Sequence, residues 1–259
     1  MIDLHCHLLP DWDDGPESWE EVEKMVEQAS EDGIQKICLT PHLFRFSRYN
    51  DDLQVLNDRF EEFFNRFGSS SHMEFYRGAE VFVHPDLVSV IEEKKLSVNG
   101  SEYVFVEFPS DQVPAGTRDL FYQMQLAGYT PIISHPERNT VFGRQPELLF
   151  DLVNRGCLVQ LTAMSLTGGF GHEVKSYAEM FLKHNLVHLL ATDAHDSTRR
   201  KPILSRAVEQ AGKIVGQEKA EAMVRQVPQA ILDNQVVPDL GQPLSPAREK
   251  KKLFGFLKR

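Results

Sequence analysis

The sequence has few cysteines, no long apolar run and no excess of positive charge. Its three cysteines, Cys6, Cys38 and Cys157, have no regular spacing, so we expect free thiols in a reducing compartment rather than a disulfide framework. No run approaches the ~18 apolar residues that a membrane-spanning helix needs. The formal net charge of −10 argues against a broad phosphate-binding face for nucleic acid. A disulfide-stabilised secreted protein, a membrane-spanning protein and a nucleic-acid-binding protein are therefore all disfavoured.

The two ends of the chain differ in character. Met1 leads straight into Ile2-Asp3-Leu4-His5 without a basic and then apolar leader, which predicts a cytoplasmic protein. Residues 1–238 are long enough for one barrel-sized domain. Residues 239–259 form a basic and apolar tail, which is either a frayed or surface-packed terminus or a contact with an acidic partner or membrane surface.

Strand-like and helix-like segments alternate along the main domain. Apolar runs predict seven strands, at residues 2–6, 35–40, 74–82, 102–107, 131–134, 157–162 and 187–192. Helical patterns lie between and after them, at residues 19–28, 51–67, 86–94, 118–126, 147–154, 174–184 and 203–214. This alternation predicts an α/β fold whose parallel sheet closes as a barrel, with an open doubly wound sheet as the alternative.

Metal-binding side chains follow most of these strands. The set comprises His5, His7, His42, Glu80, Glu107, His135, Asp193 and His195. Because the carboxyl ends of parallel strands meet on one face of a barrel, these imidazoles and carboxylates should converge on one hydrolytic metal centre. Each residue alone has an ordinary alternative role, such as a structural hydrogen bond or a buried ion pair. The paired His-x-His and Asp-x-His spacings favour the metal centre.

Three further segments leave alternatives open. Asp13 and Asp14 form either a turn or an additional ligand loop. Gly168-Gly169-Phe170-Gly171 lacks the lysine and spacing of a nucleotide-binding loop and is read as a flexible loop bordering the site. None of the cysteines is followed by an arginine at the spacing that a cysteine-based phosphatase loop requires, so a thiol nucleophile is not expected.

Taken in order, these motifs resemble a known superfamily. They are Asp3-Leu4-His5-Cys6-His7, Thr40-Pro41-His42, Gly78-Ala79-Glu80, Val106-Glu107-Phe108, His135-Pro136-Glu137-Arg138-Asn139 and Thr192-Asp193-Ala194-His195. The set resembles the polymerase and histidinol phosphatase (PHP) superfamily. Within it, the chain is similar to the manganese-dependent bacterial protein-tyrosine phosphatases of capsule and exopolysaccharide synthesis, from Met1 to about residue 235.

The resemblance implies a distorted (β/α)7 barrel that holds up to three Mn²⁺ ions, with iron, zinc, cobalt or magnesium as substitutes. It assigns nine metal ligands: His5, His7, Asp14, His42, Glu80, Glu107, His135, Asp193 and His195. Asp13 remains the alternative to Asp14. The resemblance also assigns Arg138 and Arg200 to the phosphoryl group, with Arg199 as an alternative to Arg200. A planar guanidinium suits two-point contact with phosphoryl oxygens.

The resemblance further implies hydrolysis of phosphotyrosine on a protein, such as a bacterial tyrosine kinase, by metal-activated water. Arg45 and Arg48 are expected to steer an acidic peptide, and Phe44, Phe46 and Tyr49 either wall the phenyl ring or pack on their own helix. A small-molecule phosphatase, such as a histidinol-phosphate phosphatase, is the main alternative. A PHP nuclease and a non-catalytic kinase-binding regulator are the others.

Overall fold

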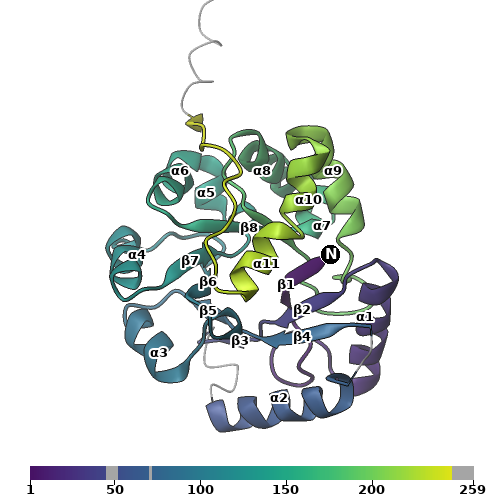
Figure 1. The fold of residues 1–259 in the computed structure, drawn as a ribbon. Helices are drawn as coiled ribbons and strands as arrows, with labels where there is room; N and C mark the ends of the chain where they lie inside the picture. The colour runs from purple at the N-terminus through teal and green to yellow at the C-terminus, as the bar shows by residue number, and fades with distance from the viewer. Residues whose placement is uncertain (45–51, 70–71, 247–259) are drawn as a thin grey trace, which may run out of the picture.

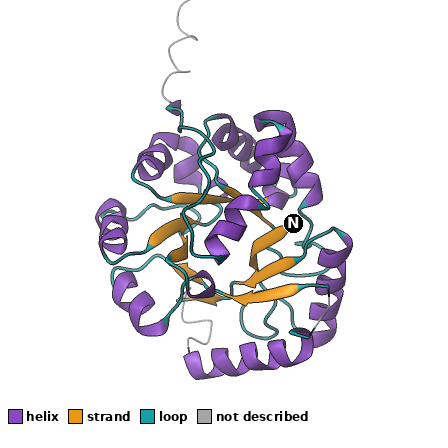
Figure 2. Cartoon of the chain, in the orientation of Figure 1, coloured by secondary structure: helices purple, strands orange, loops and turns teal. Residues whose placement is uncertain are grey.

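Parallel strands at the centre of the molecule are ringed by helices (Figures 1 and 2). The computed structural model describes residues 1–44, 52–69 and 72–246. Its strands are β1 (Ile2–Cys6), β2 (Lys36–Leu39), β3 (His42–Leu43), β4 (Glu74–Arg77), β5 (Glu80–Phe82), β6 (Tyr103–Glu107), β7 (Thr130–Ile133), β8 (Leu158–Thr162) and β9 (Leu189–Ala191).

The strands form a closed, partly interrupted barrel. One sheet has the order β1-β2-β4 and the other β3-β5-β6-β7-β8-β9, and all pairings are parallel. β2 continues into β3 after a short break at Thr40-Pro41, and β4 continues into β5 after one at Gly78-Ala79. The nine short strands therefore correspond to seven strands of the barrel. A parallel bridge between Cys6 and Ala194 joins the end of β1 to the segment after β9. The predicted seven-stranded barrel is therefore confirmed.

The helices cover the outside of the barrel. The longer ones are α1 (Trp19–Glu31), α2 (Leu53–Phe67), α3 (Leu87–Lys94), α4 (Thr117–Leu126), α6 (Pro146–Asn154), α8 (His172–Lys183) and α9 (Ser205–Val215), and each falls where a helix was predicted. The sequence patterns missed α5 (Thr140–Arg144), α7 (Ala163–Thr167), α10 (Gln217–Ala222) and α11 (Gln226–Leu232). Short 3₁₀ helices η1 (Val98–Gly100) and η2 (Pro136–Arg138) complete the described elements.

Local sequence explains where helices begin. The Ser18 side chain accepts a hydrogen bond from the Glu21 amide at the start of α1, and the Asp52 side chain does the same for Gln54 and Val55 at the start of α2. No helix in the described ranges has both the length and the apolar character needed to cross a bilayer.

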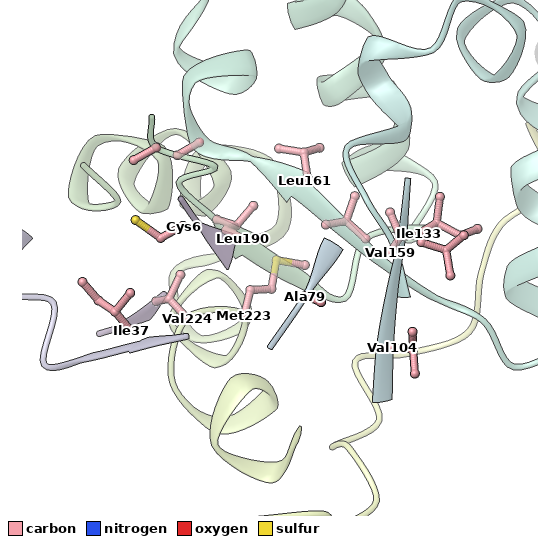
Figure 3. Close-up of a cluster of buried hydrophobic side chains, with 14 of the residues drawn as sticks. Cys6, Ile37, Ala79, Val104, Ile133, Val159, Leu161, Leu190, Met223 and Val224 are labelled. Atoms are coloured by element: carbon pink, nitrogen blue, oxygen red, sulfur yellow. The ribbon is translucent and has the colours of Figure 1, made fainter. Parts of the chain in front are cut away.

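The barrel wall separates two apolar cores. Outward-facing strand side chains, including Ile37, Val104 and Val159, pack beneath the surrounding helices (Figure 3). A smaller inner cluster at the amino-terminal end of the strands includes Leu4, Phe105 and Ile231. Ile231 belongs to α11, which lies across the strands in Figure 1 and closes this end of the barrel. Polar side chains lie at the opposite end, which is the carboxyl end of the strands.

A bulge in β1 turns its histidines toward that polar end. Asp3 pairs with Ile37 but Cys6 pairs with Leu39, so one extra residue is accommodated between them. As a result Leu4 belongs to the inner cluster, while His5 next to it also faces inward, with its ring 5.1 Å from that of Phe105. Cys6 packs in the outer core, as predicted.

Part of the predicted tail packs on the barrel. The Leu244 amide donates to the His184 carbonyl (2.8 Å), and the Lys219 ammonium donates to the Leu240 carbonyl (2.7 Å). Residues 247–259 lie outside the described residues, so the boundary at 238 stays a prediction.

Candidate metal centre

All nine side chains assigned as ligands from the sequence meet at the carboxyl ends of the strands. They form four overlapping groups in which the potential ligand atoms lie within 4.8 Å of one another. The groups are His7-Asp14-His42-His195, His5-His7-Asp193, His5-Glu80-His135 and His42-Glu80-Glu107. Eight of the nine residues are buried, and Asp14 is exposed. Because four residues belong to two groups each, these are parts of one cluster rather than separate sites.

Glu80 lies at the middle of the cluster. Its carboxylate is 2.9 Å from His42 Nδ1, 2.9 Å from His135 Nε2 and 3.2 Å from His5 Nε2. Neither of its oxygens, both fully buried, has a hydrogen-bond partner of acceptable geometry among the described residues. Burial would raise the pKa of this carboxyl, but the three imidazoles outweigh it and hold the pKa well below its usual range. A buried carboxylate that is ionised among imidazoles is an environment that a bound cation would stabilise.

Two members of the cluster have left-handed backbone conformations. His135 has φ 32° and Asp193 has φ 52°. Such conformations cost on the order of 1–3 kcal/mol in a residue that is not glycine, and they concentrate at functional sites. Here they redirect the chain where β7 and β9 end, and both side chains then lie within the cluster.

The structure separates the roles of Asp13 and Asp14. Asp14 Oδ1 lies 3.3 Å from His42 Nε2 and 3.2 Å from His195 Nε2, within one of the four groups. Asp13 is instead buried behind His7: its carboxylate is 2.8 Å from His7 Nδ1 and accepts hydrogen bonds from the His42 and Gly15 amides. Asp14 is therefore a member of a group that could hold a metal ion, whereas Asp13 contacts one of the histidines of that group from behind.

Residues that sequence reasoning did not single out support the cluster. Gln160 on β8 accepts from the His135 amide (3.1 Å), and its Oε1 lies 3.2 Å from His5 Nδ1. Asp3 accepts from the amide and the hydroxyl of Thr192, which ties β1 to the segment after β9. Both are buried polar residues within apolar strands, and that was the available signal.

Arg138 and Arg200 converge on Asp193. Arg138 follows β7 and Arg200 follows β9, and both guanidiniums contact Asp193 Oδ2, that of Arg200 at 2.6 Å. Burial would raise the pKa of Asp193, yet the two arginines keep it well below its usual range. Arg199, the alternative to Arg200, is exposed and has no contact of this kind among the described residues. The structure thus brings Arg138 and Arg200, rather than Arg199, to the cluster.

The imidazoles of the cluster differ in proton affinity. Burial opposes protonation of His7, but Asp13 raises its pKa to about 9. The pKa of His42 is raised well above its usual value by Glu80 and Asp14, again against burial. Burial, reinforced by Arg138, lowers the pKa of His135 to about 4. Protons on His7 and His42 thus balance part of the carboxylate charge, and a metal ion would have to displace them.

The donor chemistry fits divalent cations. Five imidazoles and four carboxylates supply the mixed nitrogen and oxygen ligands typical of zinc, iron and manganese sites. Orienting partners on the far side of the rings, Asp13 for His7 and Gln160 for His5, are the usual arrangement around metal-bound histidines.

A cavity of about 420 Å³ opens directly beside the cluster. Its lining includes Glu107, His135 and Arg138, together with the aromatic side chains of Phe82 and Phe108. It is of the size and mixed character that ligand pockets commonly have.

The predicted aromatic and basic loop is described only in part. Phe44 is partly buried and packs against the outer core. Arg45, Phe46, Arg48 and Tyr49 lie outside the described residues, so their steering and ring-wall roles stay predictions.

Comparison with known proteins identifies relatives along the whole barrel. The family model for capsular polysaccharide synthesis proteins, CpsB/CapC, matches residues 1–233. The chain is 33% identical to the tyrosine-protein phosphatase YwqE of Bacillus subtilis over 258 residues, covering 99% of this chain and 100% of YwqE. It is 36% identical to the putative tyrosine-protein phosphatase CapC of Staphylococcus aureus over 208 residues, 80% of this chain and 81% of CapC.

Solved structures agree with this relationship. Crystal structures described as YwqE from Bacillus subtilis and CpsB from Streptococcus pneumoniae, unique metal-dependent tyrosine phosphatases, include a match with a TM-score of 0.87 and 32% identity. The match covers 94% of this chain and 99% of the solved one. A histidinol phosphate phosphatase from Lactococcus lactis, with a TM-score of 0.53 and 15% identity over 84% of this chain and 93% of its own, shares the fold. The predicted resemblance is confirmed, and the chain belongs to the CpsB/CapC family of capsular polysaccharide synthesis proteins.

Proposed function

We propose that this protein is a metal-dependent phosphatase that hydrolyses phosphotyrosine on proteins. The observation that carries the proposal is the convergence of four metal-binding groups with two arginines at one mouth of the barrel. Relatives that match 99% and 80% of the chain are named tyrosine-protein phosphatase YwqE and putative tyrosine-protein phosphatase CapC, which supports the same activity. The buried cysteines offer no alternative nucleophile, because burial raises the pKa of the Cys6 and Cys38 thiols well above the usual range and that of Cys157 to about 12.

The nine clustered residues are the proposed ligands, with Asp14 rather than Asp13 in the set. Sharing of His5, His7, His42 and Glu80 between groups supports a multi-ion centre of up to three cations. Mn²⁺ is the proposed ion, since the mixture of imidazole and carboxylate donors suits it, as it also suits iron, zinc or cobalt.

When bound, the metal ions would supply a lowered water pKa and positive charge next to the phosphoryl group. The protein's own residues would do the rest. Arg138 and Arg200 neutralise charge on the phosphoryl oxygens, where electrostatics provide most of the acceleration in phosphoryl transfer. The cavity beside Glu107 and Arg138 receives the tyrosyl ring against Phe82 and Phe108. A phenolate leaves readily, because its conjugate acid has a pKa of ~10, so a dedicated general acid is not required.

The proposed partner is a tyrosine-phosphorylated protein, such as a bacterial tyrosine kinase of capsule synthesis. Membership of a capsular polysaccharide synthesis family supports this choice. The three free cysteines support a reducing, cytoplasmic compartment.

Replacing Arg138 tests the proposal. We expect Arg138→Ala to lower kcat/KM on a phosphotyrosyl peptide by roughly 100-fold, as for removal of one preorganised charge-stabilising group. Arg118→Ala is the matched control, since Arg118 is exposed on α4 and pairs only with Asp151 among the described residues. Turnover of histidinol phosphate is measured in parallel. Equal or better turnover of histidinol phosphate by the wild-type protein would replace this proposal with a small-molecule phosphatase.

A further inference from the structure

The loop between α7 and α8 places an aromatic ring against both arginines of the site. The Phe170 ring lies 4.8 Å from the guanidinium carbon of Arg138 and 5.8 Å from that of Arg200, measured to the ring centroid. Both distances are within the range of cation–π attraction. The two arginines come from different parts of the chain, after β7 and after β9, and Phe170 from a third.

The surrounding glycines shape the backbone turn that carries this ring. Gly168 and Gly171 flank the turn with φ of +92° each, a conformation that other residues adopt at a cost. The Gly171 amide donates to the Gly168 carbonyl (3.0 Å), and the Gly169 amide donates to that of Met164 (2.9 Å). A side chain at Gly169 would also meet Met164, at 2.4 Å. The glycine-rich segment is therefore a tight turn that presents Phe170, rather than a phosphate-binding loop.

An aromatic ring adds a second partner for two guanidiniums that carry like charge. Both contact the same oxygen, Asp193 Oδ2, although like charges side by side repel each other. Asp193 is itself a proposed metal ligand, so its charge is shared with the metal centre. The face of an aromatic ring attracts both cations without competing for either metal ions or phosphate. It also restricts the rotamers of two long side chains before a ligand arrives, which reduces the entropy lost on binding.

We propose that Phe170 is a positioning residue that holds Arg138 and Arg200 as a preformed pair for a single phosphoryl group. This inference rests on the proposed phosphatase function. It assigns Phe170 to the phosphoryl group rather than to the tyrosyl ring, for which the cavity lined by Phe82 and Phe108 is available.

Phosphate affinity tests this directly and does not depend on turnover. Inorganic phosphate is titrated into the manganese-loaded protein by calorimetry. Phe170→Leu should weaken its Kd by roughly 5- to 30-fold, the range expected for loss of partly desolvated cation–π contacts. Phe170→Trp, which keeps a ring face, should restore Kd to near the wild-type value. Phe150→Leu, the same change at a partly buried phenylalanine on α6, is the matched control and should leave Kd unchanged.

Substrate comparison separates the two roles for the ring. If Phe170 positions the arginines, Phe170→Leu raises KM for phenyl phosphate and for an alkyl phosphate by similar factors. Unchanged phosphate affinity, or a loss confined to the phenyl substrate, would overturn the proposal. Phe170→Met provides a second ring-free variant should the leucine variant not fold. A wild-type protein that binds phosphate but leaves phosphotyrosine intact would refute the proposed function, while the phosphate titrations would still decide the role of Phe170.

Discussion

Neighbouring aspartates of this protein have different contacts, which is the basis for the different roles proposed for them. Asp14 Oδ1 faces two imidazoles of the cluster and is the exposed member of its ligand group. Asp13 is buried and satisfied, since it contacts His7 Nδ1 and accepts two backbone amides. Its pKa is lowered to about 2, because His7 outweighs the effect of burial. An ionised Asp13 at His7 Nδ1 leaves His7 Nε2 facing Glu80 and Asp193 in the candidate metal cluster.

Asp13→Asn should therefore weaken metal binding while leaving every proposed ligand in place. The asparagine side chain has the same shape, but only one of its two terminal atoms can accept hydrogen bonds. It cannot keep all the contacts of Asp13 with the Gly15 amide, the His42 amide and His7 Nδ1, so the His7 ring loses its fixed orientation. Loss of such an orienting partner commonly reduces metal affinity by ~10- to 100-fold. Manganese titration against a competing chelator measures the change. Asp11→Asn is the control, because Asp11 is exposed; equal affinities in the wild type and Asp13→Asn would show that Asp13 has no orienting role.

For individual residues, the sequence predicted which side chains would lie together in the cluster, but not which residues would hydrogen-bond to them. The spacing of His5 and His7 already required them to share one face, and the histidines and carboxylates after other strands pointed to one end of the barrel. Gln160 and Asp3 were not foreseen, because a polar residue in an apolar strand does not reveal which distant group it will meet. The choice of Arg200 over Arg199 likewise depends on a loop conformation that has no local sequence signature.

Among the elements, strand ends rather than whole strands position the site. The β1 bulge, the breaks between β2 and β3 and between β4 and β5, and the left-handed residues after β7 and β9 all lie beside candidate ligands. The apolar runs in the sequence predicted the seven strands of the barrel. The runs could not predict these irregularities, because they arise from packing around the polar cluster rather than from residue preference.

The pairing of β8 with the segment before β9 should depend on pH through His188. His188 Nδ1 accepts a hydrogen bond from the Val159 amide (3.1 Å), which requires the neutral ring. Burial and then Lys219 lower its pKa to about 4. The unfolded chain, in which histidine has a pKa of ~6.5, takes up a proton first as the pH falls. The stability contributed by neutral His188 is thus complete above pH ~6.5 and is lost progressively towards pH ~4.

Thermal or urea unfolding between pH 7 and pH 5 measures this effect. In His188→Asn the amide oxygen can still accept from Val159, but the group no longer titrates. The fall in unfolding free energy from pH 7 to pH 5 should be smaller in the variant by on the order of 1–2 kcal/mol. His72→Asn, an exposed histidine on the chain, serves as the control. Identical pH dependence in wild type and His188→Asn would contradict the assigned pKa.

In the whole molecule, the two ends of the barrel are specialised. α11 and the inner apolar cluster close the amino-terminal end, whereas the carboxyl end holds the candidate metal cluster and the cavity beside it. The sequence indicated the second end through its motifs. Helix α11 at the amino-terminal end was not predicted, because a short segment such as Val227-Pro228-Gln229-Ala230-Ile231 has no extended helical periodicity. The apolar residues that close one end of the barrel and the polar residues that form the cluster at the other are therefore different sets.

Imidazoles and carboxylates from distant parts of the chain are proposed to hold catalytic cations at one mouth of the barrel. The most direct measurement is the metal content per chain, by elemental mass spectrometry, together with phosphotyrosyl-peptide hydrolysis before and after chelation. We predict more than one ion per chain, loss of hydrolysis when the metal is removed, and recovery when Mn²⁺ is restored to the same sample. Full hydrolysis by metal-free protein would show that bound cations are not required for the reaction.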